Sequence, residues 1–383
     1  MKSAFKKLPS GKHSIDAGLL FAVTLCSAIS TLLIYSITHN KVLETVGSSY
    51  WKTQAFSMGV GIVAAIVISF IDYRKLVKLW VIFVPLSLGL MALTFTSLGY
   101  RREGADDQAW LNLGFIQFQP SEVLKMAFIL TFAYHLSRDE EEMNKPLHML
   151  LLLIHGGIPI GIVGLQGDYG TAIVFAAIFG AMMITAKISW KYLVAAPFVI
   201  AGVVAVMWFN FLSNFHKQRI LILFHPGTDP ENIEYQQDLG LAAIKSGGVF
   251  GKGLFAAPEE YIYVPELHND FIFAHVGQVF GFIGSIGILI VLAYICLKVF
   301  ADSRVTRDRL GRFICMGAFG LFFTHCVMNI GMVLKVAPVI GVPLPFLSGG
   351  GTAMLSMYAV IGLVLSTYSH RAVNYNVFYD DDE

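Results

Sequence analysis

The sequence predicts an all-α integral membrane protein with about ten transmembrane helices. Hydrophobic residues make up 56% of the 383-residue chain and charged residues 14%, whereas soluble domains hold about 45–50% and about 25%. The apolar residues fall in runs of about 20, the length that crosses a bilayer as a helix. These runs predict spans at 16–38, 54–71, 77–97, 120–137, 146–165, 170–186, 192–213, 271–300, 311–335 and 350–369.

The whole chain, residues 1–383, is interpreted as one polytopic membrane domain with a large extracytoplasmic loop, 214–270, between the seventh and eighth spans. Within that loop, residues 235–246 predict a short amphipathic helix at the membrane surface. The basic N-terminus precedes an apolar run without a small-residue cleavage site, which indicates a first span rather than a signal peptide. The four cysteines lie inside apolar runs and are interpreted as buried hydrophobes.

Lysine and arginine are distributed unequally between the two sets of connections. Seventeen of them lie in one set, which includes the N-terminus, and nine in the other. Because cytoplasmic loops carry the excess of basic residues, both termini are predicted to be cytoplasmic. The loops near 98–119, 166–169, 214–270 and 336–349 then face outward. The net charge of +1 gives no indication of a nucleic-acid partner.

Charged residues inside a predicted span need an explanation, because charge in a bilayer is costly. Glu122 and Lys125 stand three residues apart at the start of the fourth span, so they share a helix face. One interpretation is a structural ion pair that locks two helices. The other is a substrate-facing pair, in which the lysine meets phosphate and the glutamate holds the lysine.

Three further charged residues lie at predicted outer ends of spans. Asp168 follows a tight turn and is interpreted either as a helix cap or as a site residue. Asp270 stands where the long loop enters the eighth span, and is either an N-cap or a general base with a raised pKa. Arg219 either snorkels to the interface or binds phosphate.

Two glycine-rich stretches complete the set. Residues 246–253, which include Lys252, are not a Walker motif because the spacing differs and no Ser or Thr follows the lysine. The stretch 338–352, which includes Ser348, is irregular backbone at membrane depth and is predicted to line a cavity. All these features share one side of the membrane, which predicts an outward-opening cavity for an anionic lipid headgroup.

Six motifs occur in order along nearly the whole chain. They are Trp110-Leu111, Phe118-Gln119-Pro120-Ser121-Glu122-x-x-Lys125, Asp168-x-Gly170-Thr171, Ser246-Gly247-Gly248-x-x-Gly251-Lys252-Gly253, Pro265-Glu266-x-His268-x-Asp270-Phe271-Ile272-Phe273, and Gly341-x-Pro343-Leu344-Pro345-Phe346. In these motifs the chain resembles the RodA/FtsW (SEDS) family of peptidoglycan polymerases, and its long loop is more similar to the RodA type. The resemblance implies a role in cell elongation, cell shape or a related wall-synthesis process.

The resemblance implies an inverting glycosyltransferase that joins lipid II units into glycan strands at the outer face of the bacterial cytoplasmic membrane. It implies Asp270 as the catalytic base and a divalent cation, Mn²⁺ or Mg²⁺, as cofactor. The implied partners are lipid II, membrane lipid and a class B penicillin-binding protein. The residues that it places in the cavity or on substrate are Glu122, Lys125, Asp168, Arg219, Trp110, Lys252 and Ser348.

The chain departs from the family pattern at several positions, namely Ala109, Gly167, Leu239, Gln278, Val279 and Gly349. These departures leave two alternatives to the polymerase. One is a lipid II flippase or transporter, since many spans with a broken helix suit that class. The other is a non-catalytic relative that acts as a scaffold for a penicillin-binding protein.

Overall fold

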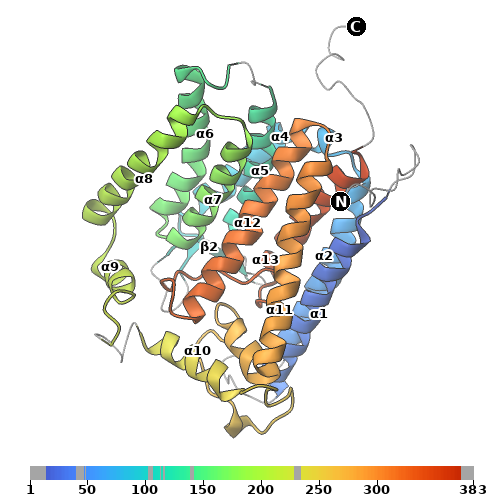
Figure 1. Cartoon of the computed structure of the whole chain (residues 1–383), viewed down its shortest axis with the longest axis vertical. Helices are drawn as coiled ribbons and strands as arrows, with labels where there is room; N and C mark the ends of the chain where they lie inside the picture. The colour runs from blue at the N-terminus through green and yellow to red at the C-terminus, as the bar shows by residue number, and fades with distance from the viewer. Residues whose placement is uncertain are drawn as a thin grey trace.

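The computed structural model describes residues 14–39, 47, 49–101, 107–112, 114, 117–138, 142–227 and 234–371. The predicted cytoplasmic termini, 1–13 and 372–383, lie outside the described residues. Within the described part, one long helix corresponds to each predicted span, so the expected count of about ten is confirmed (Figure 1). The ten are α1 (Ala17–His39), α2 (Tyr50–Phe70), α4 (Trp80–Leu93), α5 (Pro120–Arg138), α6 (Pro146–Leu165), α7 (Tyr169–Thr185), α8 (Trp190–Asn210), α11 (Ile272–Val305), α12 (Arg309–Val333) and α13 (Gly351–Ser369).

Seven of the ten helices are long and apolar enough to cross a membrane on composition alone. The helices α4 and α7 are apolar but shorter, and α5 carries the charged pair Glu122 and Lys125. Together with the family membership established below, these helices define an integral membrane protein.

Short elements join the spans. They are α3 (Tyr73–Lys78), α9 (Asn214–Leu221), α10 (Tyr235–Ser246), a 3₁₀ turn at Pro258–Glu260, and the strands β1 (Gly99–Tyr100), β2 (Trp110–Asn112) and β3 (Gln117–Phe118). The short helix predicted at 235–246 is α10. The strands form an antiparallel sheet in the order β1-β2-β3, with Tyr100 opposite Trp110. The sequence predicted only a loop there, because two- and three-residue strands carry no periodicity.

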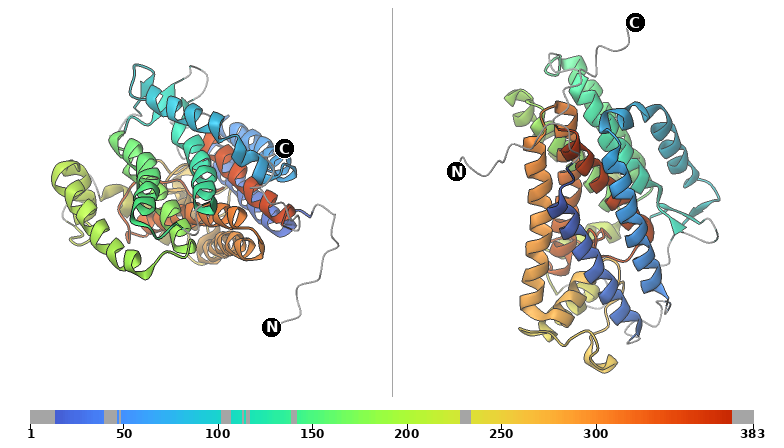
Figure 2. Two further views of the ribbon diagram at one scale, coloured as in Figure 1. Left: turned by 90° about the horizontal axis from the view of Figure 1, so that it is seen from above. Right: turned by 90° about the vertical axis from the view of Figure 1, so that its right-hand side faces the viewer.

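The helices form one bundle whose two ends differ (Figure 1). The helices α9 and α10 lie at one end, which we call the loop end, and the first residue of α1 and the last of α13 lie at the other, the terminal end. At the terminal end, Ser369 Oγ donates to the carbonyl of Ser14 at 3.3 Å. Figures 1 and 2 both show α8 at the edge of the bundle. All 21 residues of α8 are described, and none of them is buried.

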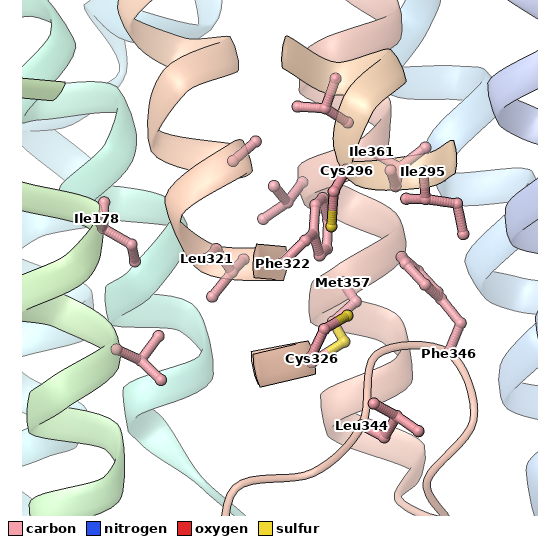
Figure 3. Close-up of a cluster of buried hydrophobic side chains, with 14 of the residues drawn as sticks. Ile178, Ile295, Cys296, Leu321, Phe322, Cys326, Leu344, Phe346, Met357 and Ile361 are labelled. Atoms are coloured by element: carbon pink, nitrogen blue, oxygen red, sulfur yellow. The ribbon is translucent and has the colours of Figure 1, made fainter. Parts of the chain in front are cut away.

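The core lies where α11, α12 and α13 meet the chain between α12 and α13 (Figure 3). The Phe346 ring packs in a tilted arrangement against Phe322, at 5.4 Å between ring centroids, and edge-to-face against Tyr358 at 5.5 Å. Its backbone φ is +61°, in the left-handed region that non-glycine residues rarely adopt. Packing of this aromatic side chain holds a sharp bend that the local sequence alone would disfavour.

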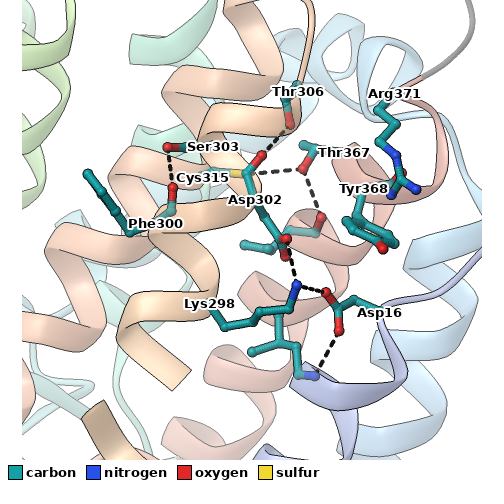
Figure 4. Close-up of polar contacts among 12 residues, drawn as sticks. Asp16, Lys298, Phe300, Asp302, Ser303, Thr306, Cys315, Thr367, Tyr368 and Arg371 are labelled. Atoms are coloured by element: carbon teal, nitrogen blue, oxygen red, sulfur yellow. Dashed lines mark hydrogen bonds and ion pairs between the residues drawn. The ribbon is translucent and has the colours of Figure 1, made fainter. Parts of the chain in front are cut away.

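An ion cluster closes the terminal end (Figure 4). Lys298 Nζ lies 2.5 Å from Asp16 Oδ2 and 3.3 Å from Asp302 Oδ1, and all three side chains are largely removed from solvent. Asp16 also accepts from the Leu19 amide at 3.0 Å, which fixes the start of α1. The cluster therefore ties the start of α1 to the end of α11.

The helix α11 is broken at Gly281, where φ is +65° and ψ is −162°. The glycine-rich loop 246–253 packs against this break: the Phe282 amide donates to the Gly248 carbonyl at 2.9 Å. The amides of Lys252 and Gly253 donate to Gln278 and Val279 at 2.9 and 3.0 Å. The glycines of the loop let its backbone approach α11, because a side chain at Gly251 would overlap the α11 backbone.

Candidate functional site

The irregular chain at 336–350, here called the break segment, joins α12 to α13 at the loop end. Polar side chains from several helices bind its backbone carbonyls. Arg219 Nη1 donates to Val339, Asn329 Nδ2 to Val342, and His325 Nδ1 to Pro343. Irregular backbone at membrane depth is tolerated where the protein satisfies its polar groups. The break segment is thus a scaffold on which residues from distant parts of the chain converge.

Asp270 lies against this scaffold. Its Oδ2 is 3.5 Å from the position that a Cβ on Gly341 would take, so the lack of a side chain at Gly341 leaves room beside the carboxylate. The N-cap of α11 is Phe271, without a side-chain cap bond. Asp270 directly precedes this capping position, at the point where the long loop enters α11.

The main chain that leads to Asp270 is held at three consecutive carbonyls. The carbonyl of His268 accepts from the Gly349 amide at 2.7 Å. That of Asn269 accepts from Ser348 Oγ at 2.6 Å, and that of Asp270 from Asn329 Nδ2 at 2.8 Å. Ser348 therefore contacts the residue that directly precedes Asp270, through that residue's backbone carbonyl.

Glu122 and Lys125 form an ion pair on the first turns of α5, with Nζ 2.8 Å from Oε1. Their exposed fractions are 3% and 1%. The Ser356 hydroxyl of α13 donates to the Glu122 carbonyl at 3.1 Å, and the second carboxylate oxygen, Oε2, is buried without a hydrogen-bond partner among the described residues. Burying a charge pair with an unpaired acceptor lowers the stability of the fold. Glu122 Oε2 therefore remains available to accept a hydrogen bond or to bind a cation.

Asp168 is the N-cap of α7. Its Oδ1 accepts from the Thr171 amide at 2.9 Å and its Oδ2 from Gln119 Nε2 at 3.0 Å. Burial raises the pKa of the Asp168 carboxyl to about 6, although the hydrogen bond from Thr171 acts in the opposite direction. Gln119 directly precedes α5, so this bond ties the start of α7 to the helix that carries Glu122 and Lys125.

Arg219 lies on α9, with its guanidinium carbon 4.3 Å from the centre of the Phe215 ring. Its bond to Val339 measures 3.0 Å and spans 120 residues of sequence. The side chain thus holds α9 against the break segment and brings a permanent positive charge to the loop end.

Two sequence-predicted residues lie apart from this group. Lys252 Nζ donates to the Glu260 carbonyl, and its amide donates to the Gln278 carbonyl of α11, more than two helical turns beyond Asp270. Trp110 lies in β2, and the nearby Gln108 amide donates to the Gln166 carbonyl at 3.0 Å, two residues before Asp168. Arg219 binds the break segment, Asp270 lies beside it and Ser348 is part of it. Glu122, Lys125 and Asp168 lie at the starts of α5 and α7, which the bond from Gln119 ties together. Lys252 and Trp110 lie around this group.

The described residues contain no cluster of three or more His, Cys, Asp and Glu side chains arranged to hold a metal. Mg²⁺ is usually bound through one or two carboxylates together with substrate phosphates rather than by a cage of protein ligands. Glu122 Oε2 and Asn329 Oδ1 are buried acceptors without a partner among the described residues. The unused carboxylate oxygen of Glu122 fits a cation that is bound jointly with a phosphate-bearing ligand.

The sequence reasoning missed His325 and Asn329, and it quoted Gln119 and Gly341 within motifs without giving them a role. His325 and Asn329 stand four residues apart inside an apolar span, so they share one face of α12. Their exposed fractions are 2% and 0%. Polar residues in a span are functional candidates by default, and this pattern was available in the sequence.

The fold and the site define a polytopic helical membrane protein with a buried ion pair and a carboxylate beside a break segment. Residues 17–372 match the family model of the cell cycle proteins FtsW, RodA and SpoVE. The chain belongs to this family.

Curated relatives span the chain. The peptidoglycan glycosyltransferase MrdB of Escherichia coli K12 is 30% identical over 371 residues, which are 96% of each chain. The probable peptidoglycan glycosyltransferase FtsW of Thiomicrospira cyclica is 30% identical over 359 residues, 92% of this chain and 91% of that one.

Two solved structures share the fold. One is a chain from a study of polymerization and crosslinking by a peptidoglycan synthase complex, with a TM-score of 0.77 and 26% identity over 94% of this chain and 98% of that one. The rod shape determining protein RodA of Thermus thermophilus has a TM-score of 0.69 and 24% identity, over 94% of this chain and 99% of that one.

Proposed function

We propose that the protein is a peptidoglycan glycosyltransferase that polymerises lipid II into glycan strands. The observation that carries the proposal is the arrangement of Asp270. Its backbone is held at three consecutive carbonyls, and its carboxylate lies beside the open space at Gly341. A general base needs such a fixed position within hydrogen-bond reach of the hydroxyl that it deprotonates.

In the proposed reaction, the Asp270 carboxylate takes the proton of the sugar 4-hydroxyl as that oxygen attacks the anomeric carbon of a second lipid II. The bond from the anomeric carbon to the pyrophosphate breaks, and the lipid pyrophosphate leaves with its electron pair. Attack opposite the leaving group inverts the configuration, and no covalent enzyme intermediate is needed.

The charges at the loop end suit an anionic lipid. Lys125 lies at the start of α5 and Arg219 binds the break segment, and fixed positive charge stabilises a departing pyrophosphate. Glu122, whose Oε2 is buried without a partner among the described residues, would hold Mn²⁺ or Mg²⁺ together with the pyrophosphate. Such a cation, when bound, offsets the charge of the pyrophosphate.

The orientation follows from the basic residues. The terminal end holds most of them, in its connections and in the adjoining helix ends, including Arg74, Lys187, Lys298 and Arg312, which favours the cytoplasmic side for that end. The loop end then faces outward from the bacterial cytoplasmic membrane. A class B penicillin-binding protein is the proposed partner, supported by the fold shared with a chain of a peptidoglycan synthase complex.

The test supplies labelled lipid II with Mn²⁺ or Mg²⁺ to the purified protein, with and without a class B partner, and resolves glycan products on a gel. We expect chains from the wild type and an Asp270→Asn variant slower by about 10²–10⁴-fold, the usual contribution of a general base. Asp238→Asn is the matched control, because this carboxylate lies at the same end but pairs with Lys335 at 2.5 Å.

The outcomes separate the alternatives. No chains from correctly folded wild type with its partner bound would overturn the polymerase. Transfer of lipid II across a vesicle membrane without chain growth would identify a flippase. Partner binding and wall synthesis that survive Asp270→Asn unchanged in cells would identify a scaffold.

A further inference from the structure

Asn329 makes an unusual pair of contacts near the end of α12. Its side chain is fully buried, and Nδ2 donates to the carbonyls of both Asp270 and Val342 at 2.8 Å each. An amide nitrogen carries two donors, so this arrangement uses its full donor capacity. The residue therefore joins the chain before α11 directly to the break segment.

The two carbonyls also fix the orientation of the amide. Because Nδ2 must face them, Oδ1 faces away, and it is buried without a partner among the described residues. Leaving a buried acceptor unpaired destabilises a fold. Asn329 thus occupies its position at a cost to stability, which favours a role other than stabilising the fold.

The direction of the Asp270 side chain depends on this contact. Ser348 and Gly349 hold the two preceding carbonyls, so Asn329 is the last of three anchors and the one that acts on Asp270 itself. Fixing a carbonyl fixes its peptide plane, because the backbone has only two soft dihedrals per residue. The carboxylate is thereby presented beside Gly341.

We propose that Asn329 is a positioning residue for Asp270, which sets the direction of the carboxylate through the main-chain carbonyl. The role rests on the proposed function only in taking Asp270 as the base. Displacing a reacting group by about 1 Å can cost about 10²-fold in rate. Loss of the anchor acts on turnover, while substrate binding by the rest of the site is retained.

Gln237 provides a matched control. This amide lies on α10, has an exposed fraction of 1%, and donates through Nε2 to Met332 and Ala337 at 2.7 and 3.1 Å. It is the same kind of buried amide bridging two carbonyls at the same end, but it binds none of the carbonyls of residues 268–270. Its loss imposes a comparable structural cost without releasing Asp270.

The first measurement compares Asn329→Leu and Gln237→Leu in lipid II polymerisation, per folded molecule and with the partner present. We expect Asn329→Leu to lower kcat by about 10–100-fold, to leave the Kd for lipid II within about twofold and to move the acidic limb of the pH–rate profile. Gln237→Leu retains the wild-type profile. Asn329→Ser keeps one hydrogen-bond donor, so its kcat is expected to lie between those of the wild type and Asn329→Leu. If the leucine variant does not fold, the serine variant is compared with Gln237→Leu instead.

The second measurement does not depend on turnover. In an Asp270→Cys background, the thiol is labelled with a methanethiosulfonate reagent, and the labelling rate is measured with Asn329→Ser or Gln237→Leu added. We expect Asn329→Ser to change the rate several-fold and Gln237→Leu to leave it unchanged. Equal rates in all backgrounds would overturn the positioning role, whether or not the wild type makes glycan. A loss of lipid II affinity that matches the loss of kcat would instead make Asn329 a binding residue.

Discussion

Lys125 Nζ donates to Glu122 Oε1 at 2.8 Å, between two side chains that the bundle removes almost completely from solvent. Removing one partner of such a pair leaves an uncompensated buried charge, which typically costs about 3–5 kcal/mol. We therefore expect Lys125→Met alone to lower the thermal stability of the purified protein strongly. Glu122→Gln combined with Lys125→Met is expected to regain most of that loss, measured by thermal unfolding in detergent.

The activity of the double variant decides between the two interpretations of this pair. A structural lock predicts that stability and polymerisation recover together. A substrate-facing pair predicts a stable protein that remains inactive, because the cation that meets phosphate is gone. The pair Lys145 and Glu142, also three residues apart but exposed at the other end of the bundle, is the control, since exposed pairs contribute little.

Gly341→Ala is expected to lower turnover through Asp270. The backbone φ at Gly341 is +65°, which costs alanine about 1–2 kcal/mol, and the new methyl group would contact the Asp270 carboxylate. Gly227→Ala is the control: φ there is +84°, and nothing lies within 4 Å of the added carbon. Similar turnover in the two variants, measured in the lipid II assay, would contradict the contact.

Gln278→Glu tests one departure from the family pattern. The buried Gln278 amide accepts from the Ile262 amide at 2.7 Å and donates to the Ile262 carbonyl at 3.2 Å. A carboxylate can replace the first bond but not the second, and it would face a carbonyl oxygen. We expect a loss of about 1–3 kcal/mol, the cost of an unsatisfied buried group. An unfolding temperature equal to that of the wild type at pH 8 would show that the amide is not required.

Asp168 predicts a specific pH dependence. Burial raises the pKa of its carboxyl to about 6 in the folded protein, from an unfolded value near 3.9. The folded state therefore binds the proton more tightly, and the stabilisation from this group is full below about pH 4 and is lost as pH rises through about 6. Asp168→Asn cannot titrate, so the stability difference between wild type and variant should change across this window. A constant difference in unfolding temperature from pH 4 to pH 7 would contradict the raised pKa.

The spans could be predicted because each depends on a continuous stretch of sequence. A bilayer demands a run of apolar residues whatever the rest of the chain does, so the predicted ends of α6 match the structure and those of α13 lie within one residue. The break in α11 could not be predicted in this way. Gly281 takes its positive φ because the loop at Gly248 binds the chain just beyond it, and that contact exists only in the folded bundle.

In the site, too, some features could be predicted from the sequence and others could not. Asp270, Glu122 and Lys125 were visible as charges at or inside apolar runs. The partner of Arg219 was not, because Val339 lies 120 residues away and contributes a backbone carbonyl, which every residue possesses. Asn329 was overlooked although the polar pair that it forms with His325 is visible in the sequence, because its importance comes from the two carbonyls that the fold brings to it.

The sequence of the exposed helix α8 is constrained differently from that of the buried helices. Since none of its 21 residues is buried, the choice among valine, leucine, isoleucine and phenylalanine there is set by the surrounding hydrocarbon and not by a neighbouring side chain. A cysteine carrying a spin label or a fluorophore can therefore replace an exposed residue such as Val199 without creating a cavity. The helix offers a position from which the movements of a working polymerase can be recorded while its interior is left intact.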